Sequence, residues 1–252
     1  MPIHAEQFTA WIAALETRHF AELTFPEVSR ALRALSSTYV ERRGGLGEGA
    51  ALTGAGKRAA FALFYGPLHY LLVREIVLAL PHASGRAATM VDLGCGTGSS
   101  GAAWAAASDG PPSIVGVDRH PWALGEAAWT YRQFGLTART RQGDVVRGGL
   151  PKPPVSLLAA FTLNELADEP REAVLRRLLA RAASGDRVLI VEPLARGIAP
   201  WWNRWRDQAV AAGGRGDEWR FRVELPAIVS KLDRAAGLNH RELTGRSLWL
   251  GA

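Results

Sequence analysis

The segment Val91-Asp92-Leu93-Gly94-Cys95-Gly96-Thr97-Gly98 decides the fold class of this chain. It joins an apolar run, typical of a buried strand, to a run that favours a helix. Glycines at such a junction let the backbone turn tightly and approach a ligand without a Cβ in the way. The N–H groups at the start of the following helix favour anionic or polar ligand groups. The segment therefore predicts a strand, a ligand-binding loop and a helix in succession.

The sequence on both sides of this segment alternates between strands and helices. The expected strands lie near residues 88–93, 113–118, 138–142, 155–161 and 186–192, and a closing strand is expected within 240–250. The expected helices cover residues 98–108, 121–134, 169–183, 200–212 and 226–236. Strands separated by helices of this length form a parallel sheet with right-handed crossovers. The predicted fold is therefore a doubly wound, mostly parallel α/β sheet.

The first part of the chain is predicted to be helical. Apolar positions predict a helix over residues 5–19, and Thr24 with Glu27 predicts a capping box at the start of a second helix. A glycine-rich loop, Gly44–Gly56, leads to a third helical stretch that must bend at Gly66-Pro67, because proline cannot continue the hydrogen-bond ladder. This region forms an N-terminal helical addition to the sheet.

The domain division follows from this change of pattern. We expect an N-terminal helical region over residues 1–85 and a ligand-binding α/β domain over residues 86–252. The chain has 252 residues, of which 48% are apolar and 21% charged, and this profile is typical of a folded globular protein.

The composition also limits the partners and the location. The one cysteine, Cys95, excludes a disulfide framework or a cysteine-based metal site within one chain. We expect no membrane partner, because no apolar run reaches about 18 residues, and the absence of a signal-peptide pattern favours a cytoplasmic location. The net charge of +6 collects in residues 1–89 and 196–252, which leaves contact with a polyanion such as RNA open.

Three acidic residues mark the ends of successive expected strands. Asp92 ends the first, Asp118 ends the second, and Asp144 follows the third. An acid at the end of the second strand is placed to accept hydrogen bonds from both hydroxyls of a ribose. Together with the glycine loop, these acids predict a nucleoside-binding site at the carboxyl edge of the sheet.

Two kinds of nucleoside cofactor are compatible with this loop. Residues 96–101 match the G-x-G-x-x-G pattern of dinucleotide-binding enzymes. The carboxylate of Asp92 would repel a pyrophosphate, however, whereas it suits an amino group bound directly or through water. The arrangement favours the amino-acid portion of S-adenosylmethionine, and a nicotinamide-dependent oxidoreductase is the weaker alternative.

The DLGCGTG segment at residues 92–98 resembles the first motif of the class I S-adenosylmethionine-dependent methyltransferases, and the resemblance covers residues 88–195. It implies a Rossmann-like methyltransferase sheet, S-adenosylmethionine as cofactor, and transfer of a methyl group to an unidentified acceptor. The cofactor-binding residues that it implies are Asp92 at the amino group, Gly94, Cys95, Gly96 and Gly98 along the methionine part, Asp118 at the ribose, and Arg119, Asp144 and Val145 around the adenine.

The resemblance also places the residues after the fourth strand at the methyl-transfer centre. Phe161 is assigned to the cofactor pocket, and Asn164 and Glu165 are the candidate catalytic residues. Glu165 or a histidine is a candidate to take a proton from the acceptor, and the alternative for Glu165 is that it begins or caps the next helix. Since the sulfonium supplies the electrophile, the protein mainly has to align donor and acceptor and exclude water.

Four aromatic residues are candidates for contact with the acceptor. Tyr65 and Tyr70 flank the Gly66-Pro67 bend, and Trp201 and Trp202 begin a tryptophan-rich helix. The tryptophan faces would stack on a flat or cationic acceptor, and the two tyrosines would help to close the site over the cofactor. Packing in the core is the alternative for all four. The histidines show no metal-binding spacing, so no metal site is predicted.

A narrower resemblance concerns the acceptor. The N-terminal helical region, the FTLNEL segment at residues 161–166 and the VEP segment at 191–193 are similar to the methyltransferase family associated with the mitochondrial small ribosomal subunit and its bacterial relatives. Members of that family usually carry a cysteine cluster near the C-terminus that binds an iron–sulfur cluster, and this chain lacks it. RNA or a ribosomal component and a small molecule both stay open as acceptors, and a non-catalytic cofactor-binding assembly factor is the alternative to an enzyme.

Overall fold

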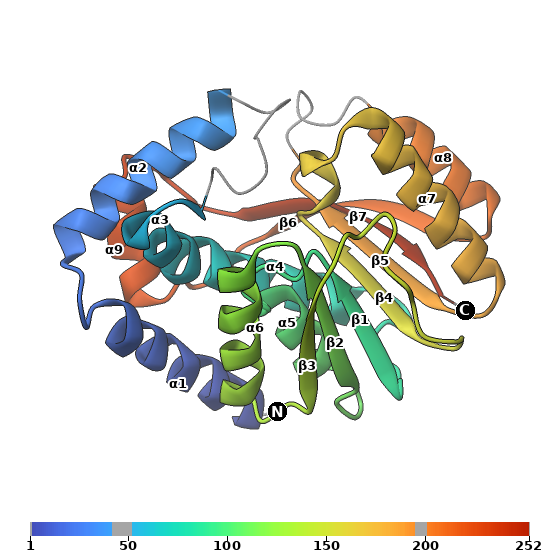
Figure 1. Cartoon of the computed structure of the whole chain (residues 1–252), viewed down its shortest axis with the longest axis horizontal. Helices are drawn as coiled ribbons and strands as arrows, with labels where there is room; N and C mark the ends of the chain where they lie inside the picture. The colour runs from blue at the N-terminus through green and yellow to red at the C-terminus, as the bar shows by residue number, and fades with distance from the viewer. Residues whose placement is uncertain (1, 42–51, 195–200, 252) are drawn as a thin grey trace.

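The computed structural model describes residues 2–41, 52–194 and 201–251, which form a seven-stranded sheet with helices on both faces (Figure 1). The strands are β1 (Thr89–Leu93), β2 (Ser113–Asp118), β3 (Ala138–Gln142), β4 (Ser156–Ala160), β5 (Arg187–Glu192), β6 (Arg215–Phe221) and β7 (Leu243–Leu250). The helices are α1 (Pro2–His19), α2 (Phe25–Glu41), α3 (Ala55–Ala60), α4 (Gly66–Ala79), α5 (Ser99–Ala107), α6 (Pro121–Gln133), α7 (Asp168–Ala183), α8 (Trp202–Ala211) and α9 (Ala227–Ala235).

The strand order in the sheet is β3-β2-β1-β4-β5-β7-β6. Strands β1 to β5 pair in parallel, and β7 is antiparallel to both of its neighbours, β5 and β6. The chain runs outward from β1 to β3 and then returns to place β4 beside β1. Ligands of open α/β sheets bind outside the carboxyl ends of the strands at such a reversal. The predicted doubly wound, mostly parallel α/β fold is confirmed, and the reversal lies at the glycine segment.

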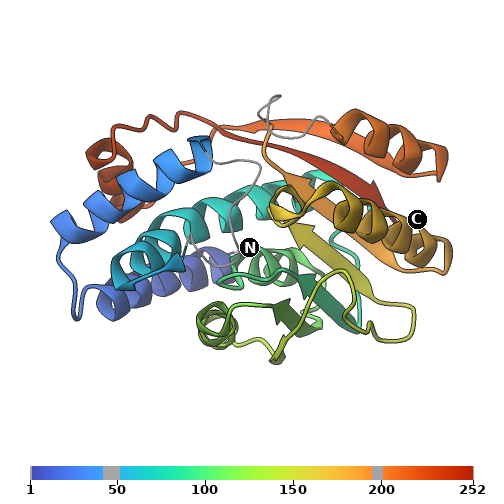
Figure 2. The same cartoon turned by 45° about the horizontal axis from the view of Figure 1, so that its top comes forward.

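Side chains that alternate along each strand supply two hydrophobic clusters, one on each face of the sheet. In β1, Met90 packs with α1, α4, α5 and α6, whereas Val91 packs with α7 and α8. In β4, Leu158 and Leu157 divide between the same two clusters. Figure 2 shows the N-terminal helices gathered at the end of the molecule opposite α7 and α8. Both faces of the central strands are therefore buried, as in a doubly wound fold.

Helices α1 and α2 confirm the helical character predicted for the first part of the chain. Helix α1 is tied to α6 by Glu126, whose buried carboxylate contacts His19 Nε2 at 3.0 Å and Arg18 Nε at 3.3 Å. At the start of α2, the carboxylate of Glu27 accepts hydrogen bonds from the backbone N–H and the hydroxyl of Thr24. The bonds that Glu27 accepts from Thr24 form one half of the predicted capping box.

The third helical stretch runs from Ala55 to Ala79 with a change of hydrogen-bond register instead of a break. Residues Phe61–Tyr65 form a π-helical turn, in which the N–H of Gly66 bonds to the carbonyl of Phe61. The wider turn precedes Pro67, which has no N–H to donate. By length and mean hydropathy, 1.3, this run would suffice to cross a membrane, but 67% of the apolar window is buried inside the fold, as in a core helix.

Strand β6 was not predicted. Its residues, Arg-Gly-Asp-Glu-Trp-Arg-Phe, lack a regular apolar alternation because β6 lies at the edge of the sheet and is only partly buried. The predicted helices at 200–212 and 226–236 and the closing strand correspond to α8, α9 and β7. Most of the predicted loop Gly44–Gly56 lies outside the described residues.

Candidate active site

The glycine segment forms a loop that is locked against the turn after β4. Gly94, Gly96 and Gly98 all have positive φ angles, of 70°, 51° and 78°. A Cβ on Gly94 would lie 2.3 Å from Cγ2 of Thr162, and the hydroxyl of Thr162 donates to the carbonyl of Leu93 at 3.1 Å. Only glycine fits at Gly94, and the loop and the turn after β4 therefore hold one shape together.

Asp118 fixes the other side of the loop. One of its carboxylate oxygens accepts from the N–H of Gly96 at 2.9 Å, and the other accepts from the N–H of His120 at 2.8 Å. The side chain is partly exposed at the carboxyl end of β2. It thus lies at the position expected for a ribose-binding carboxylate, next to the glycine loop.

Asp144 and Arg119 form an ion pair beside this carboxylate. Arg119 contacts Asp144, and the carboxylate of Asp144 also accepts from the N–H of Val146 at 2.6 Å. Partial burial raises the pKa of Asp144, but the bond from Val146 and the charge of Arg119 outweigh it, and the net shift is downward. Val145 is buried next to the pair. The three residues assigned to the adenine region therefore lie together after β2 and β3.

Asp92 lies behind the loop and is buried. Its carboxylate accepts from the hydroxyl of Tyr131 at 3.0 Å, and it also accepts from the N–H of Gly101. Burial raises the pKa of Asp92 to about 7, the two hydrogen bonds lower it, and Asp118 raises it further. A Cβ on Gly101 would lie 2.4 Å from the Asp92 carboxylate. The third glycine of the G-x-G-x-x-G pattern thus makes room for Asp92, which removes the reason for a dinucleotide interpretation.

Cys95 faces the same buried region. Its thiol and the hydroxyl of Tyr131 interact below the loop, and a Cβ on Gly116 would lie 3.1 Å from Sγ and 3.2 Å from the Tyr131 oxygen. Burial raises the pKa of the Cys95 thiol well above its usual value. The side chain of Cys95 therefore packs in the interior, and only its backbone is available to a ligand at the loop.

The turn after β4 is held in a strained conformation. Phe161 has a positive φ of 57°, and its N–H bonds to the carbonyl of Val191 at 2.8 Å. Such a backbone costs on the order of 1–3 kcal/mol in a residue other than glycine and is often found at functional sites. Leu163–Glu165 then form a single helical turn. This turn carries Asn164 and Glu165 at the carboxyl end of β4.

Asn164 and Glu165 lie on this turn near the acids of the nucleoside region. The side-chain oxygen of Asn164 is buried without a hydrogen-bond partner. Glu165 is open to solvent on one side and surrounded by protein on the others, and this burial, with the charge of Asp118, raises its pKa to about 7. A carboxyl group with this pKa is matched to proton transfer near neutral pH.

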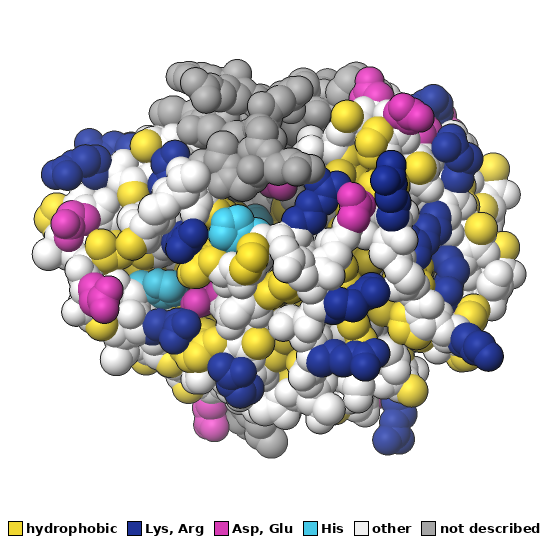
Figure 3. Space-filling view, viewed as in Figure 1, with side chains coloured by type: hydrophobic (Ala, Val, Ile, Leu, Met, Phe, Trp, Pro, Cys, Tyr) yellow, Lys and Arg dark blue, Asp and Glu magenta, His cyan; other side chains and the backbone are white. Residues whose placement is uncertain are grey.

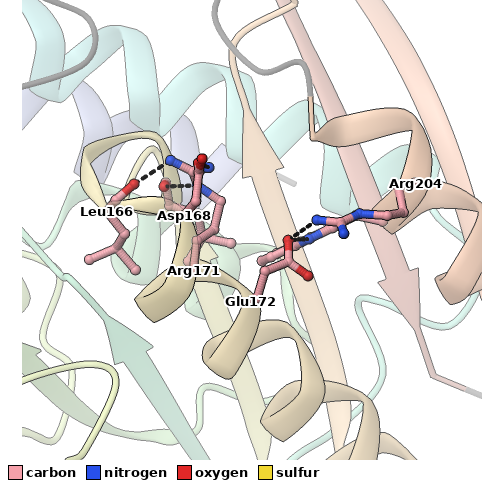
Figure 4. A network of polar contacts seen from close by, with 7 residues as sticks. Leu166, Asp168, Arg171, Glu172 and Arg204 are labelled. Atoms are coloured by element: carbon pink, nitrogen blue, oxygen red, sulfur yellow. Dashed lines mark hydrogen bonds and ion pairs between the residues drawn. The ribbon is translucent and has the colours of Figure 1, made fainter.

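Two buried ionisable residues that the sequence did not single out support the turn. The carboxylate of Glu192, at the end of β5, accepts from the N–H of Leu163 at 2.8 Å. Burial raises the pKa of Glu192 to about 8. Arg171 of α7 donates through Nε to the carbonyl of Leu163 at 3.0 Å and also bonds to Leu166 (Figure 4). These contacts fix the backbone that carries Asn164 and Glu165.

An aromatic cluster covers the open side of the loop. It consists of Phe61, Tyr65, His69 and Phe161, and all four side chains are partly exposed. The rings of His69 and Phe161 stack with centroids 3.8 Å apart and an interplanar angle of 13°. His69 is surrounded by protein, and this burial lowers its pKa to about 3. Its imidazole is therefore neutral at physiological pH.

Three of the four aromatic candidates for acceptor contact lie in the core, and their assignment is corrected. Tyr70 is fully buried between Phe8 and Phe134, with ring centroids 4.8 and 5.1 Å away. Trp201 and Trp202 are 8% and 3% exposed and pack against the sheet.

The faces of these two tryptophans are also occupied. The guanidinium of Arg171 lies 5.0 Å from the Trp201 ring, and that of Arg246 lies 4.4 Å from the Trp202 ring. The apolar spacing that suggested a stacking wall reflects the packing of α8, which Glu172 also holds through Trp205 and Arg204 (Figure 4).

The residues present fit the methionine part and the nucleoside of S-adenosylmethionine. A Cβ built on Gly96 would meet only Phe61, at 3.9 Å, so this part of the loop is open for close approach of a ligand. The hydroxyl of Thr97, in the loop, and the side-chain oxygen of Asn164, on the turn after β4, are both buried without hydrogen-bond partners. Among the described residues, no group of three or more His, Cys, Asp or Glu side chains is placed to hold a metal ion.

Residues 90–185 match a family model described as a methyltransferase domain. The chain therefore carries a methyltransferase domain, and its cofactor is S-adenosylmethionine. The match covers β1 to α7, which carry the glycine loop, the acids and the turn after β4. No curated protein sequence matches the chain.

Solved structures show the same fold at low sequence identity. The mitomycin 7-O-methyltransferase MmcR is 18% identical, with a TM-score of 0.55, and the alignment covers 96% of this methyltransferase and 73% of MmcR. The O-methyltransferase NcsB1 of neocarzinostatin biosynthesis, solved with S-adenosylmethionine, is 16% identical, with a TM-score of 0.50 and coverages of 95% and 74%. A precorrin 8w decarboxylase of Methanobacterium thermoautotrophicum is 17% identical, with a TM-score of 0.50 and coverages of 72% and 90%.

His69, Tyr131, Glu192 and Arg171 are the site residues that sequence reasoning missed. His69, Tyr131 and Glu192 each act through a partner that is distant in the chain, such as Phe161 for His69 and Asp92 for Tyr131. Arg171 instead bonds to Leu163 and Leu166, eight and five residues before it. No local sequence motif predicts contacts between residues that are far apart in the chain. The one available signal is the position of Glu192 at the end of a predicted strand, next to Pro193.

Proposed function

We propose that this methyltransferase acts on a base in RNA. The observation that carries the proposal is an exposed basic surface on the strand β3, the loop that follows it and helix α7. Its exposed residues are Arg139, Arg141, Arg147, Lys152 and Arg176, and the half-buried Arg177 lies next to them in the sequence and the fold. Figure 3 shows Lys and Arg side chains spread over this face of the molecule. Basic side chains without matching acids bind the phosphate backbone irrespective of sequence.

Burial of acidic groups makes the exposed charge of the middle segment net basic, although the segment has a balanced charge in sequence. Residues 90–195 contain 11 acidic and 11 basic residues. Asp92, Glu126, Asp186 and Glu192 are buried, however, whereas Arg171 is the buried basic residue of the segment. Counted from the sequence, the excess of positive charge lies in residues 1–89 and 196–252. In the structure, the exposed charged side chains of residues 90–195 are also net basic.

Two of these basic side chains, Arg141 and Arg177, lie close to each other and to the loop after β3. Arg177 donates to the carbonyls of Val145 and Val146, and Arg141 donates to that of Gly149. Desolvation lowers the pKa of Arg177, and the charges of Arg181 and Arg141 lower it further. Like charges held this close favour a polyanionic partner that neutralises them.

The site supplies the parts that methylation of a base needs. Enzymes that modify a base bring it out of the stack and hold it between aromatic or apolar side chains. The turn after β4, which carries Asn164 and Glu165, lies beside the partly exposed rings of the aromatic cluster. In this proposal Asn164 orients the acceptor group through its unpaired side-chain oxygen, and Glu165 accepts the proton that the acceptor releases. When bound, S-adenosylmethionine supplies the methyl group.

Transfer of a tritiated methyl group from S-adenosylmethionine to total cellular RNA tests the proposal. We expect RNase-sensitive incorporation, and we expect the Arg139→Glu/Arg147→Glu variant to bind a fluorescein-labelled RNA about tenfold more weakly at low salt. Lys231→Glu/Arg234→Glu on α9, at the other end of the molecule in Figures 1 and 2, is the matched control. Equal loss of RNA affinity in the two variants would contradict a role for the basic surface.

A small planar acceptor is the second candidate. It is supported by the structural likeness to MmcR and NcsB1, which extends over the N-terminal helices as well as the sheet, and NcsB1 was solved with 2-hydroxy-5-methyl naphthoic acid. Hydroxynaphthoic acids therefore serve as probes in the same transfer assay. Incorporation into these acids with none into RNA would favour this candidate.

A further inference from the structure

We propose that the aromatic cluster of Phe61, Tyr65, His69 and Phe161 recognises the positive charge of the cofactor's sulfonium and so raises the affinity for S-adenosylmethionine relative to that for S-adenosylhomocysteine. The inference rests on the use of S-adenosylmethionine and is independent of the acceptor. It assigns to the π-helical turn and to His69 a role in cofactor selection.

The cluster lies against the part of the loop where the methionine portion is expected. A Cβ on Gly96 would come within 3.9 Å of the Phe61 ring, and a Cβ on Gly66 would come within 3.5 Å of the Thr97 hydroxyl. On the other side, His69 stacks on Phe161, the residue directly after β4. The cluster thus bridges the glycine loop and the turn that carries Asn164 and Glu165.

The four rings are arranged around His69. The centroid of its imidazole lies 6.1 Å from the rings of Phe61 and Tyr65 and 3.8 Å from that of Phe161. Tyr65 is fixed by a hydrogen bond to Ser36 of α2. The π-helical turn Phe61–Tyr65, with Gly66 after it, places Phe61, Tyr65 and His69 on one side of the helical run. π-helical turns are rare and are often found at functional sites.

The chemistry of the rings suits a sulfonium. A sulfonium has no N–H or O–H group, so that a protein cannot bind it by accepting a hydrogen bond from such a group. Aromatic faces attract cations of this kind, as they do quaternary ammonium groups. The imidazole of His69 is neutral because burial lowers its pKa, and a neutral ring does not repel a neighbouring cation. S-adenosylhomocysteine carries an uncharged sulfur and would gain nothing from this effect.

The ratio of the dissociation constants of S-adenosylhomocysteine and S-adenosylmethionine measures this selectivity. We expect His69→Leu and Phe61→Leu each to lower the ratio about threefold to thirtyfold, mainly through weaker binding of S-adenosylmethionine. His69→Phe keeps an aromatic face and should retain a ratio near that of the wild type. Calorimetric titration at about pH 8, where Glu165 is ionised, gives both constants.

Phe8→Leu is the matched control, because Phe8 belongs to a separate aromatic group with Trp11 and Tyr70. It should leave the ratio unchanged. An unchanged ratio in both His69→Leu and Phe61→Leu, or an equal loss of affinity for the two ligands, would overturn the proposal. If circular dichroism shows that one leucine variant does not fold, the ratios measured for the other leucine variant and for His69→Phe still test the proposal. If the wild-type protein bound neither ligand, the use of the cofactor itself would be contradicted.

Discussion

At the residue scale, the candidate site depends on carboxyl groups that differ in their surroundings. Asp144 is partly exposed, and the hydrogen bond from Val146 and the charge of Arg119 lower its pKa and keep it ionised. Asp92 and Glu192 are buried and have pKa values raised to about 7 and about 8. Glu165 combines access to solvent with a pKa of about 7. Glu165 is therefore the carboxyl group of this set whose charge a ligand at the site can change.

Glu165 should make the affinity for S-adenosylmethionine depend on pH. A bound cation favours the ionised carboxylate, so below the raised pKa binding must release a proton. Affinity should therefore rise about tenfold from about pH 6 to about pH 8 and then level off. The affinity for S-adenosylhomocysteine, whose sulfur is neutral, should rise less over the same pH range. In Glu165→Gln, the pH profiles of the two ligands should become alike. Calorimetric titration of both ligands across this range checks the effect, and identical pH profiles for the two ligands in the wild-type protein would contradict it.

At the scale of elements, the carboxyl ends of β1 and β4 are interlocked. The loop after β1 presents Gly94 to Thr162 in the turn after β4, and Thr162 bonds back to the carbonyls of Leu93 and Gly94 at 3.1 and 3.3 Å. The two elements therefore cannot change shape independently. This interlock aligns the loop that holds the donor with the turn that faces the acceptor.

Gly94→Ala should damage both stability and cofactor binding. The positive φ alone costs on the order of 1–3 kcal/mol, and the added Cβ collides with Thr162. We expect the melting temperature to fall by roughly 5 °C or more and S-adenosylhomocysteine to bind more weakly. Gly125→Ala, on an exposed part of α6 where a Cβ meets nothing within 4 Å, is the control and should be neutral or slightly stabilising. A similar outcome for the two variants would argue against the interlock.

Elements with a strong local pattern could be predicted from the sequence. The buried strands β1, β2, β4 and β5 consist of short apolar runs, and the helices between them have a regular spacing, so their positions followed within one or two residues. Strand β6 could not be predicted, because its side chains are half-exposed at an edge and its pairing with β7 is decided by tertiary contacts.

The candidate site could be predicted where it depends on backbone position, and not where it depends on long-range pairs. Gly94, Asp118 and Asp144 lie at strand ends that the alternation of strands and helices already located. The bond from Tyr131 to Asp92 and the stack of His69 on Phe161 join residues 39 and 92 positions apart. The tryptophans of α8 were overinterpreted, because aromatic residues at helical spacing also suit core packing.

At the scale of the whole molecule, the N-terminal helices and the sheet share one hydrophobic cluster. Trp11 of α1 and Tyr70 of α4 pack in the same cluster as Leu158 and Leu189 of the central strands. Helix α4 thereby brings His69 over the carboxyl edge of the sheet. The helical addition is therefore part of the wall of the candidate site as well as part of the core.

The central claim is that this molecule binds S-adenosylmethionine at the glycine loop. Calorimetric titration with S-adenosylhomocysteine, with NAD as the control ligand, tests it most directly. We predict a dissociation constant in the micromolar range for S-adenosylhomocysteine, no binding of NAD, and a loss of affinity of at least about tenfold in Asp118→Ala, which removes a charged acceptor from two ribose hydroxyls. Binding of NAD, or absence of binding by S-adenosylhomocysteine to the folded wild-type protein, would contradict the claim.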